Sequence, residues 1–135
     1  MMQEQHGFTL LEIMIAIFVF SVGLLGLATM QVSAVRGNNF SDTLTEAANL
    51  ATDRMEKIMA AGYNTVADTD DDGAGGLNDA TVATADDQEV QGIYQIFWNV
   101  AEDVTVNNTK TVNIIITWIE RGATRTLTMQ GIKAR

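Results

Sequence analysis

The sequence predicts an α+β fold, in which a long N-terminal helix (about residues 8–61) packs on a small C-terminal antiparallel sheet (about residues 92–132). Three patterns predict it: an uncharged apolar stretch over 13–35, three- and four-residue apolar spacing over 41–61, and strict alternation from Gly92 onward. Spacing near 3.6 is typical of a helix facing a core, and a period of two is typical of half-buried strands. The pattern changes once along the chain, so helix and sheet are segregated as in α+β proteins.

The first part of the helix is long and apolar enough to cross a bilayer. Residues 13–35 contain 23 residues without a charge, about 34 Å of helix. Glu12 is the only charge between Phe8 and Val35, and a carboxylate in such a segment costs roughly 2.5–3.5 kcal/mol. A single-pass anchor and a secretory signal are alternatives. A secretory signal has a basic start, whereas residues 1–7 contain neither Lys nor Arg.

The second part of the helix is amphipathic over 41–61. Its apolar positions are Leu44, Ala47, Ala48, Ala51, Met55, Ile58 and Met59. Charged residues lie between them, which predicts that one face packs on the sheet. The methionines are interpreted as core residues and not as ligands. We expect Gly62 to end the helix, because glycine favours the left-handed conformation that closes many helices.

Three strands are expected in the C-terminal part of the chain, over 92–101, 110–120 and 124–132. Turn residues separate them, namely Asn107 with Asn108 and Arg121 with Gly122, which favours an antiparallel meander. Trp98 and Trp118 fall on these strands. They are interpreted as packing residues and not as a ligand-stacking pair.

Residues 63–89 have the composition of a loop, and ten of the 17 acidic residues lie between Asp68 and Asp103. This loop contains a pattern similar to D-x-D-x-D-G of calcium loops. The residues that the pattern selects as ligands are Asp68, Asp70, Asp72, the carbonyl of Ala74, and Asp79. Alternate carboxylates on a tight loop can converge on a hard cation. The other interpretation is a solvated acidic loop without metal.

Composition excludes several functions. The net charge of -9 argues against a basic nucleic-acid surface. The chain has no cysteine, and its one histidine, His6, precedes the apolar stretch. Thiol nucleophiles, disulfides and zinc–thiolate sites are therefore excluded, and without another imidazole a Ser-His-Asp triad is excluded after residue 7. We expect no enzyme and no required cofactor, with Ca²⁺ as the one candidate ligand.

Residues 7–12, Gly-Phe-Thr-Leu-Leu-Glu, are similar to the processing site of type IV pilins and of type II secretion pseudopilins. The stretch 21–28, followed by Gln31, further resembles the minor pilins called PilV. The resemblance implies that a prepilin peptidase cuts after Gly7, that the new N-terminal Phe8 is N-methylated, and that Glu12 pairs with the α-amine of Phe8 during assembly. It also implies the type IV pilin fold.

Under this resemblance the chain is organised as a leader at 1–7, a membrane and filament-core helix at 8–36, and a periplasmic or extracellular domain at 37–135. Other major and minor pilins would contact the helix, and the inner membrane would hold the subunit before it enters the pilus. A minor pseudopilin of a type II secretion system and a membrane-anchored calcium-binding module are the alternatives.

Overall fold

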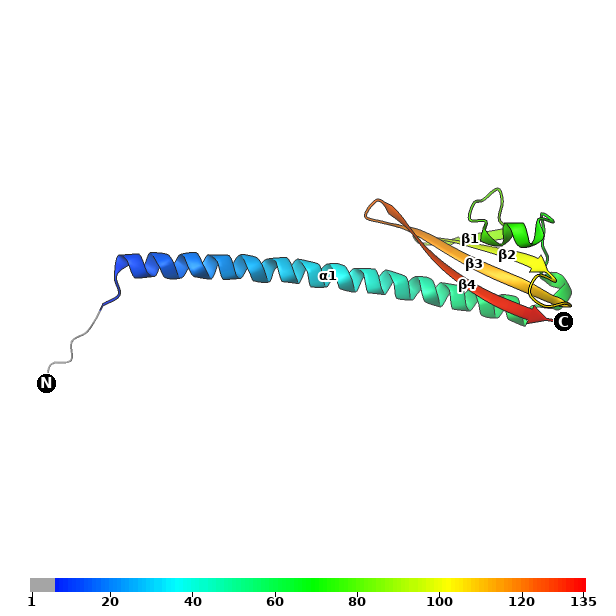
Figure 1. The fold of residues 1–135 in the computed structure, drawn as a ribbon, viewed down its shortest axis with the longest axis horizontal. Helices are drawn as coiled ribbons and strands as arrows, with labels where there is room; N and C mark the ends of the chain where they lie inside the picture. The colour runs from blue at the N-terminus through cyan, green and yellow to red at the C-terminus, as the bar shows by residue number, and fades with distance from the viewer. Residues whose placement is uncertain (1–6) are drawn as a thin grey trace. The chain divides into compact units, whose positions relative to one another are not determined.

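The structure is a computed structural model that describes residues 7–135. Its elements are α1 (Leu10–Ala60), the short 3₁₀ helices η1 (Tyr63–Thr65) and η2 (Gly73–Asn78), and the strands β1 (Asp87–Gln91), β2 (Tyr94–Glu102), β3 (Thr109–Glu120) and β4 (Ala123–Ala134) (Figure 1). The expected α+β fold, a long helix packed on an antiparallel sheet, is confirmed. His6 and the rest of the leader before Gly7 lie outside the described residues.

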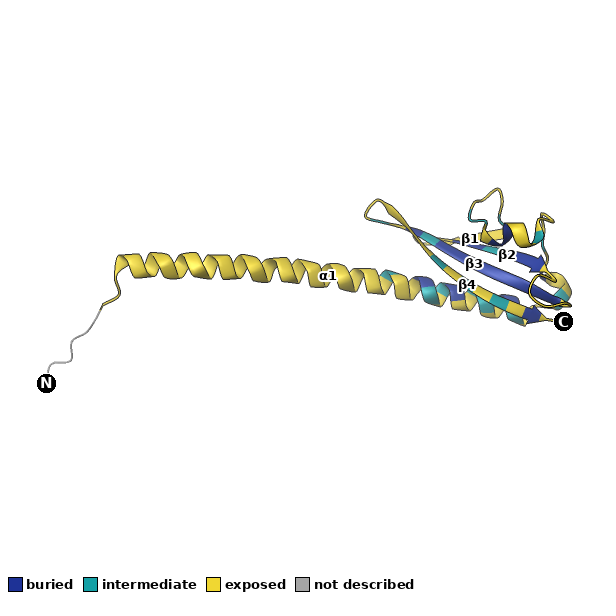
Figure 2. Ribbon diagram, viewed as in Figure 1, coloured by how far each residue is buried: buried dark blue, intermediate teal, exposed yellow. Residues whose placement is uncertain are grey.

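The chain divides into two compact units, and the boundary falls between Asp42 and Thr43. In the first unit every described residue is exposed (Figure 2). Large apolar side chains are among them, such as Phe18, which is 70% exposed. This part of α1 is long and apolar enough to cross a membrane. Exposed apolar surface on this scale is unfavourable in water, so the segment needs lipid or other protein around it.

The second unit, Thr43–Arg135, contains the hydrophobic core. Ala47, Ala51 and Ile58 recur on one face of α1 and are buried against one face of the sheet (Figure 2). Small alanines at the first two positions let the helix approach the strands closely. The core residues that the sheet contributes are Tyr94, Ile96, Val100, Val112, Ile114, Ile116 and Trp118. The amphipathic pattern therefore predicted the correct helix face.

The sheet has four strands in the order β1-β2-β3-β4, and every neighbouring pair is antiparallel. The expected meander is correct, but the expected number of strands is wrong. β1 lies partly within the predicted 63–89 loop, and β2 begins at Tyr94 and not at Gly92. All five residues of β1 are exposed, so this edge strand lacks the apolar alternation by which the other strands were found.

Two tight turns explain these boundaries. Gly92 has a φ of 61° and, with Ile93, forms the two-residue turn between β1 and β2. Arg121 and Gly122 have φ values of 52° and 78° and connect β3 to β4. Positive φ values at the centre of a two-residue hairpin match the twist of the flanking strands. The predicted turn at Arg121 and Gly122 is confirmed.

The second face of the sheet is also partly covered. Phe97 and Ile115 are almost fully buried on the face opposite α1, and η2 contacts β2 and β3, with Leu77 buried. Buried asparagines lie on the same face, because alternate residues of a strand point to one side. The acidic loop is therefore folded onto the sheet.

The C-terminal end of α1 is capped from the far end of the chain. The buried ammonium of Lys133 on β4 donates hydrogen bonds to the backbone carbonyls of Ile58, Met59 and Ala61, at 3.1, 2.6 and 2.6 Å. The helix ends just before Gly62, as expected, but Gly62 has a φ of -63° and is extended, so it does not form a left-handed cap. The last carbonyls of a helix have no intrahelical partner, and Lys133 supplies one.

Tyr94 forms hydrogen bonds with α1 at the point where the buried part of the helix begins. Its hydroxyl donates to the carbonyl of Thr43 at 3.1 Å and to the carboxylate of Glu46 at 3.0 Å. Burial, together with the hydrogen bond to Glu46 and its charge, raises the pKa of Tyr94 to about 12. The neutral phenol is thus the form that the fold favours.

We expect Tyr94→Phe to lower the free energy of unfolding by about 1.5–3 kcal/mol, the usual contribution of a hydrogen bond to a charged acceptor. Because the folded pKa is raised, this stabilisation is complete below pH 10.0 and is lost as the pH rises through about 12. Urea unfolding of the wild-type protein and of Tyr94→Phe, repeated across this pH range, measures the difference in the free energy of unfolding. Tyr63→Phe is the matched control, and an equal loss there would contradict the assignment.

Candidate functional site

The helix α1 begins with a turn whose backbone N–H groups are capped. The side-chain oxygen of Thr9 accepts a hydrogen bond from the backbone N–H of Glu12 at 3.2 Å, and the carbonyl of Thr9 accepts from the same N–H and from Ile13. Thr9 is therefore the N-cap of α1. The sequence Thr-x-x-Glu from 9 to 12 is the pattern of a capping box, a local signal that the sequence analysis did not use.

Glu12 lies in the first turn of α1 and is exposed. An acidic residue there interacts favourably with the positive end of the helix dipole, which gives the residue a local role as well. Phe8 and Glu12 line one shallow groove together with Ile13, Ala16 and Ile17. The residue whose amine is the expected partner of Glu12 thus lies on the same side of the helix start.

Gly7 has no structural reason to be glycine within the described residues. A Cβ added to it would meet no atom within 4 Å, and its φ lies outside the left-handed region. Gly23 is equally open, so the fold itself tolerates side chains at both positions. A requirement for glycine at position 7 would therefore have to come from another protein that recognises the segment.

The acidic loop is organised by one of its own carboxylates. Asp68 accepts hydrogen bonds from the backbone N–H groups of Asp71 and Gly73, at 2.8 and 2.9 Å. Both of these residues have positive φ, 59° and 58°. A carboxylate that accepts two backbone donors holds a tight turn, so Asp68 has a structural role in the loop.

The predicted calcium ligands are brought together only in part. Carboxylate oxygens of Asp70, Asp72 and Asp79 all lie within 4.8 Å of one another. Asp68 lies in a second group, with Asp70 and Asp86. The predicted carbonyl ligand, that of Ala74, belongs to an exposed residue of the η2 helix that follows the turn (residues 73–78).

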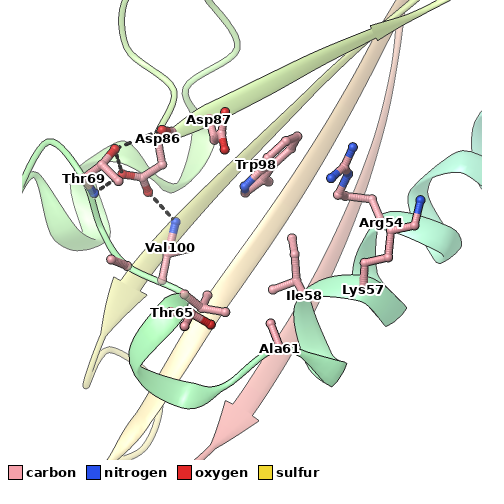
Figure 3. A pocket seen from close by; sticks show the side chains of 12 residues that line it. Arg54, Lys57, Ile58, Ala61, Thr65, Thr69, Asp86, Asp87, Trp98 and Val100 are labelled. Atoms are coloured by element: carbon pink, nitrogen blue, oxygen red, sulfur yellow. Dashed lines mark hydrogen bonds between the residues drawn. The ribbon is translucent and has the colours of Figure 1, made fainter.

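Asp86 is the residue that sequence analysis missed. Its carboxylate accepts hydrogen bonds from the backbone and hydroxyl of Thr69 and from the N–H of Val100, at 2.7 Å for the latter (Figure 3). These partners are 17 and 14 residues away in the chain. The calcium pattern does not extend to position 86. A local sequence pattern cannot predict hydrogen bonds between residues so far apart in the chain.

The pKa of the Asp72 carboxyl is raised above its usual value. Desolvation, the charge of Asp70 and a hydrogen bond with it, and the charges of Asp68 and Asp79 all raise the pKa of the Asp72 carboxyl. The same carboxylate lies against Gly76, where an added Cβ would be 1.9 Å from its Oδ1. A nearby cation would relieve this repulsion.

Buried asparagines fasten the loop to the sheet. Asn99 on β2 donates to the carbonyl of Asp79 at 2.8 Å, and Asn113 on β3 donates to the carbonyl of Leu77. Both asparagines are almost fully buried. These bonds attach the backbone at Leu77 and Asp79 to the sheet.

Comparison with known proteins places the functional signal at the N-terminus. Residues 2–28 match the family model described as the prokaryotic N-terminal methylation motif. No curated protein and no solved structure matches the chain. The motif covers Gly7, Phe8 and Glu12 and the first turns of α1, and it implies processing by a prepilin peptidase.

Proposed function

We propose that this chain, which carries a type IV pilin-like leader, is a minor pilin of the PilV type. In this proposal the prepilin peptidase removes the leader, and the mature subunit enters a type IV pilus, where it helps to initiate assembly or forms the tip. The function lies in the placement of α1 among other subunits, and the motif suggests a structural protein, not an enzyme.

One observation carries the proposal: the methylation motif leads directly into a largely apolar helix segment, and every described residue before Thr43 is exposed. Such a segment is stable in a bilayer or among similar helices. The long helix on a four-stranded antiparallel sheet matches the pilin fold. The leader and the apolar helix together support membrane anchoring.

The proposal assigns a role to each residue of the N-terminal segment. Gly7 precedes the cut, and Phe8 becomes the methylated N-terminal residue. Glu12 pairs with the amine of Phe8, either its own or that of a neighbouring subunit. The subunit waits in the inner membrane with its N-terminus in the cytoplasm, and its partners in the pilus are other major and minor pilins.

Mass spectrometry of the mature protein tests the proposal. We expect the N-terminal peptide to begin at an N-methylated Phe8, and we expect Gly7→Val to retain the leader. The matched control is Gly23→Val, which changes an equally open glycine and should be processed normally. A mature protein that begins at Met1 would overturn the proposal and leave a membrane-anchored module.

Filament isolation separates the pilus from the secretion system. We expect antibodies against the second unit to label sheared surface pili at few positions, mostly near one end. A minor pseudopilin would share the leader and the fold, but it would be absent from such pili. Processed protein that is confined to the membrane fraction of piliated cells would therefore favour the secretion system.

We propose calcium binding at the acidic loop as a second function, because Asp70, Asp72 and Asp79 converge to within 4.8 Å. Three carboxylates at this distance repel one another unless a cation or protons intervene. Ca²⁺ takes oxygen ligands in flexible geometry, which suits a site made of three carboxylates with water completing the shell.

Calorimetry of the full chain in detergent checks this proposal. We expect a dissociation constant of about 10⁻⁴–10⁻³ M, the range of extracellular calcium modules. Asp79→Asn should weaken binding roughly tenfold, since affinity follows the number of ligand charges. Glu56→Gln, an exposed acid on α1, should change nothing. Absence of heat at millimolar calcium would refute the site.

A further inference from the structure

A cavity of about 240 Å³ lies between the end of α1 and the start of the β1–β2 hairpin (Figure 3). It lies within the second unit, and its apolar lining is Ile58, Ala61, Val66, Ala67, Trp98 and Val100. Pockets for drug-sized ligands usually measure 300–1,000 Å³. The volume therefore suits one inserted side chain better than a whole cofactor.

Both basic groups around this cavity already have ion-pair partners. Arg54 forms an ion pair with Glu89 and stacks over the Trp98 ring, 4.2 Å from its centre. Lys57 pairs with Asp53 at 2.7 Å. An acidic guest would have to displace one of these pairs, and a basic guest would lie beside the like charges of Arg54 and Lys57, so the cavity favours an uncharged side chain.

The carboxylate of Asp86 on the opposite wall is occupied as well, because it accepts hydrogen bonds from Thr69 and Val100 (Figure 3). Trp98 lies between this network and Arg54, with its indole at the centre of the view. An aromatic guest would pack against the indole and the aliphatic floor, contacts that such side chains favour.

The strand beside the cavity, β1, is an edge of the sheet and is exposed along its whole length. Gln91 opposes Tyr94 across the two-residue turn, where the two residues exchange hydrogen bonds. Bonded pairs then alternate along an antiparallel ladder. Gln88 and Val90 therefore direct their backbone N–H and C=O groups away from β2. The N–H of Gln88 already donates to the Asp87 carboxylate at 2.8 Å, so an added strand would pair with the Val90 N–H and the two carbonyls.

We propose that the free edge of β1 and the Trp98 cavity together bind an extended segment of a partner protein. The segment adds as a fifth strand beside β1 and inserts one uncharged aromatic side chain into the cavity. Residues 68–89 contain eight acidic residues and no Lys or Arg, so the segment carries basic residues on either side of the aromatic one. This binding activity goes beyond the role of α1 in assembly.

A designed peptide tests the inference on the full chain in detergent. The probe is a nine-residue Thr/Val strand with two lysines and one central Phe, and its twin has Ala in place of Phe. We expect the Phe peptide to bind at least about tenfold more tightly, because its aromatic side chain is removed from water in the cavity. The NMR signal of the Trp98 indole N–H should shift on binding. The signal of Trp118, which is 3% exposed, should stay in place.

Two variants separate the edge from the cavity. Val90→Pro removes an outward N–H without removing a ladder bond, and it should weaken both peptides, whereas Val90→Thr should not. Ala67→Phe fills the cavity and should abolish only the advantage of the Phe peptide. A Trp98 indole signal that does not shift at millimolar peptide would overturn the proposal. Unchanged peptide binding by Val90→Pro would also overturn it, provided that an unchanged Trp118 signal shows that the variant is folded.

Discussion

Replacement of Lys133 by methionine is expected to lower the free energy of unfolding by about 2–4 kcal/mol. The substitution keeps an apolar stem of similar length but removes the ammonium that bonds Ile58, Met59 and Ala61. Three carbonyls at the negative end of the α1 dipole then lose their donor. Lys133 is 7% exposed, so water replaces it only if the end of the helix separates from β4.

Urea unfolding followed by tryptophan fluorescence measures this loss, and an unchanged slope would show that the denatured state is unaffected. Lys57→Met is the matched control. That lysine is exposed and pairs only with Asp53 one turn away, a type of pair that contributes about 0.5 kcal/mol or less. Equal stability losses in the two variants would contradict the capping role of Lys133.

Glu12→Val is expected to leave membrane insertion intact and to abolish incorporation into filaments. Among apolar helices the α-ammonium of Phe8 would be buried without a counter-charge, and breaking a buried ion pair costs about 3–5 kcal/mol. The N-cap survives in this variant, because Thr9 accepts from the backbone N–H of residue 12 and not from its side chain. The amounts of the variant in the membrane fraction and in the pilus fraction, compared with those of the wild-type protein, measure the effect.

The structure also supplies the control for Glu12. Thr9→Ala removes the cap, worth about 1 kcal/mol, and keeps the carboxylate. If assembly depends on the charge pair, Thr9→Ala assembles and Glu12→Val does not. If Thr9→Ala fails to the same extent, the first turn of α1 matters more than the pairing of Glu12. Normal incorporation of Glu12→Val would refute the proposed role outright.

Elements with a strong local pattern were predictable to within a few residues. The expected helix at 8–61 is Leu10–Ala60 in the structure, and the three expected strands differ from β2, β3 and β4 by one or two residues at the ends. β1 was missed because an exposed edge strand shows no apolar alternation. The end of the helix near Gly62 was predicted, but its capping by a lysine from β4 was not.

The candidate calcium site was also predicted in part from local sequence. The spacing of Asp70, Asp72 and Asp79 suggested their convergence, and these three do lie together. The pattern did not anticipate that Asp68 would cap its own turn, nor that Asp86 would reach Val100 on the next strand. Those outcomes depend on which backbone donors the folded sheet brings within reach.

Neighbouring residues and a period along the chain are enough to predict the N-terminal methylation motif, the apolar span and the α+β class of this protein. The cap of α1 by Lys133, the role of Asp86 and the cavity beside Trp98 became visible in the folded chain alone. Each of these joins groups that are far apart in the chain, up to 75 residues in the case of Lys133 and Ile58. Their positions follow from the packing of α1 on the sheet, which no local pattern records.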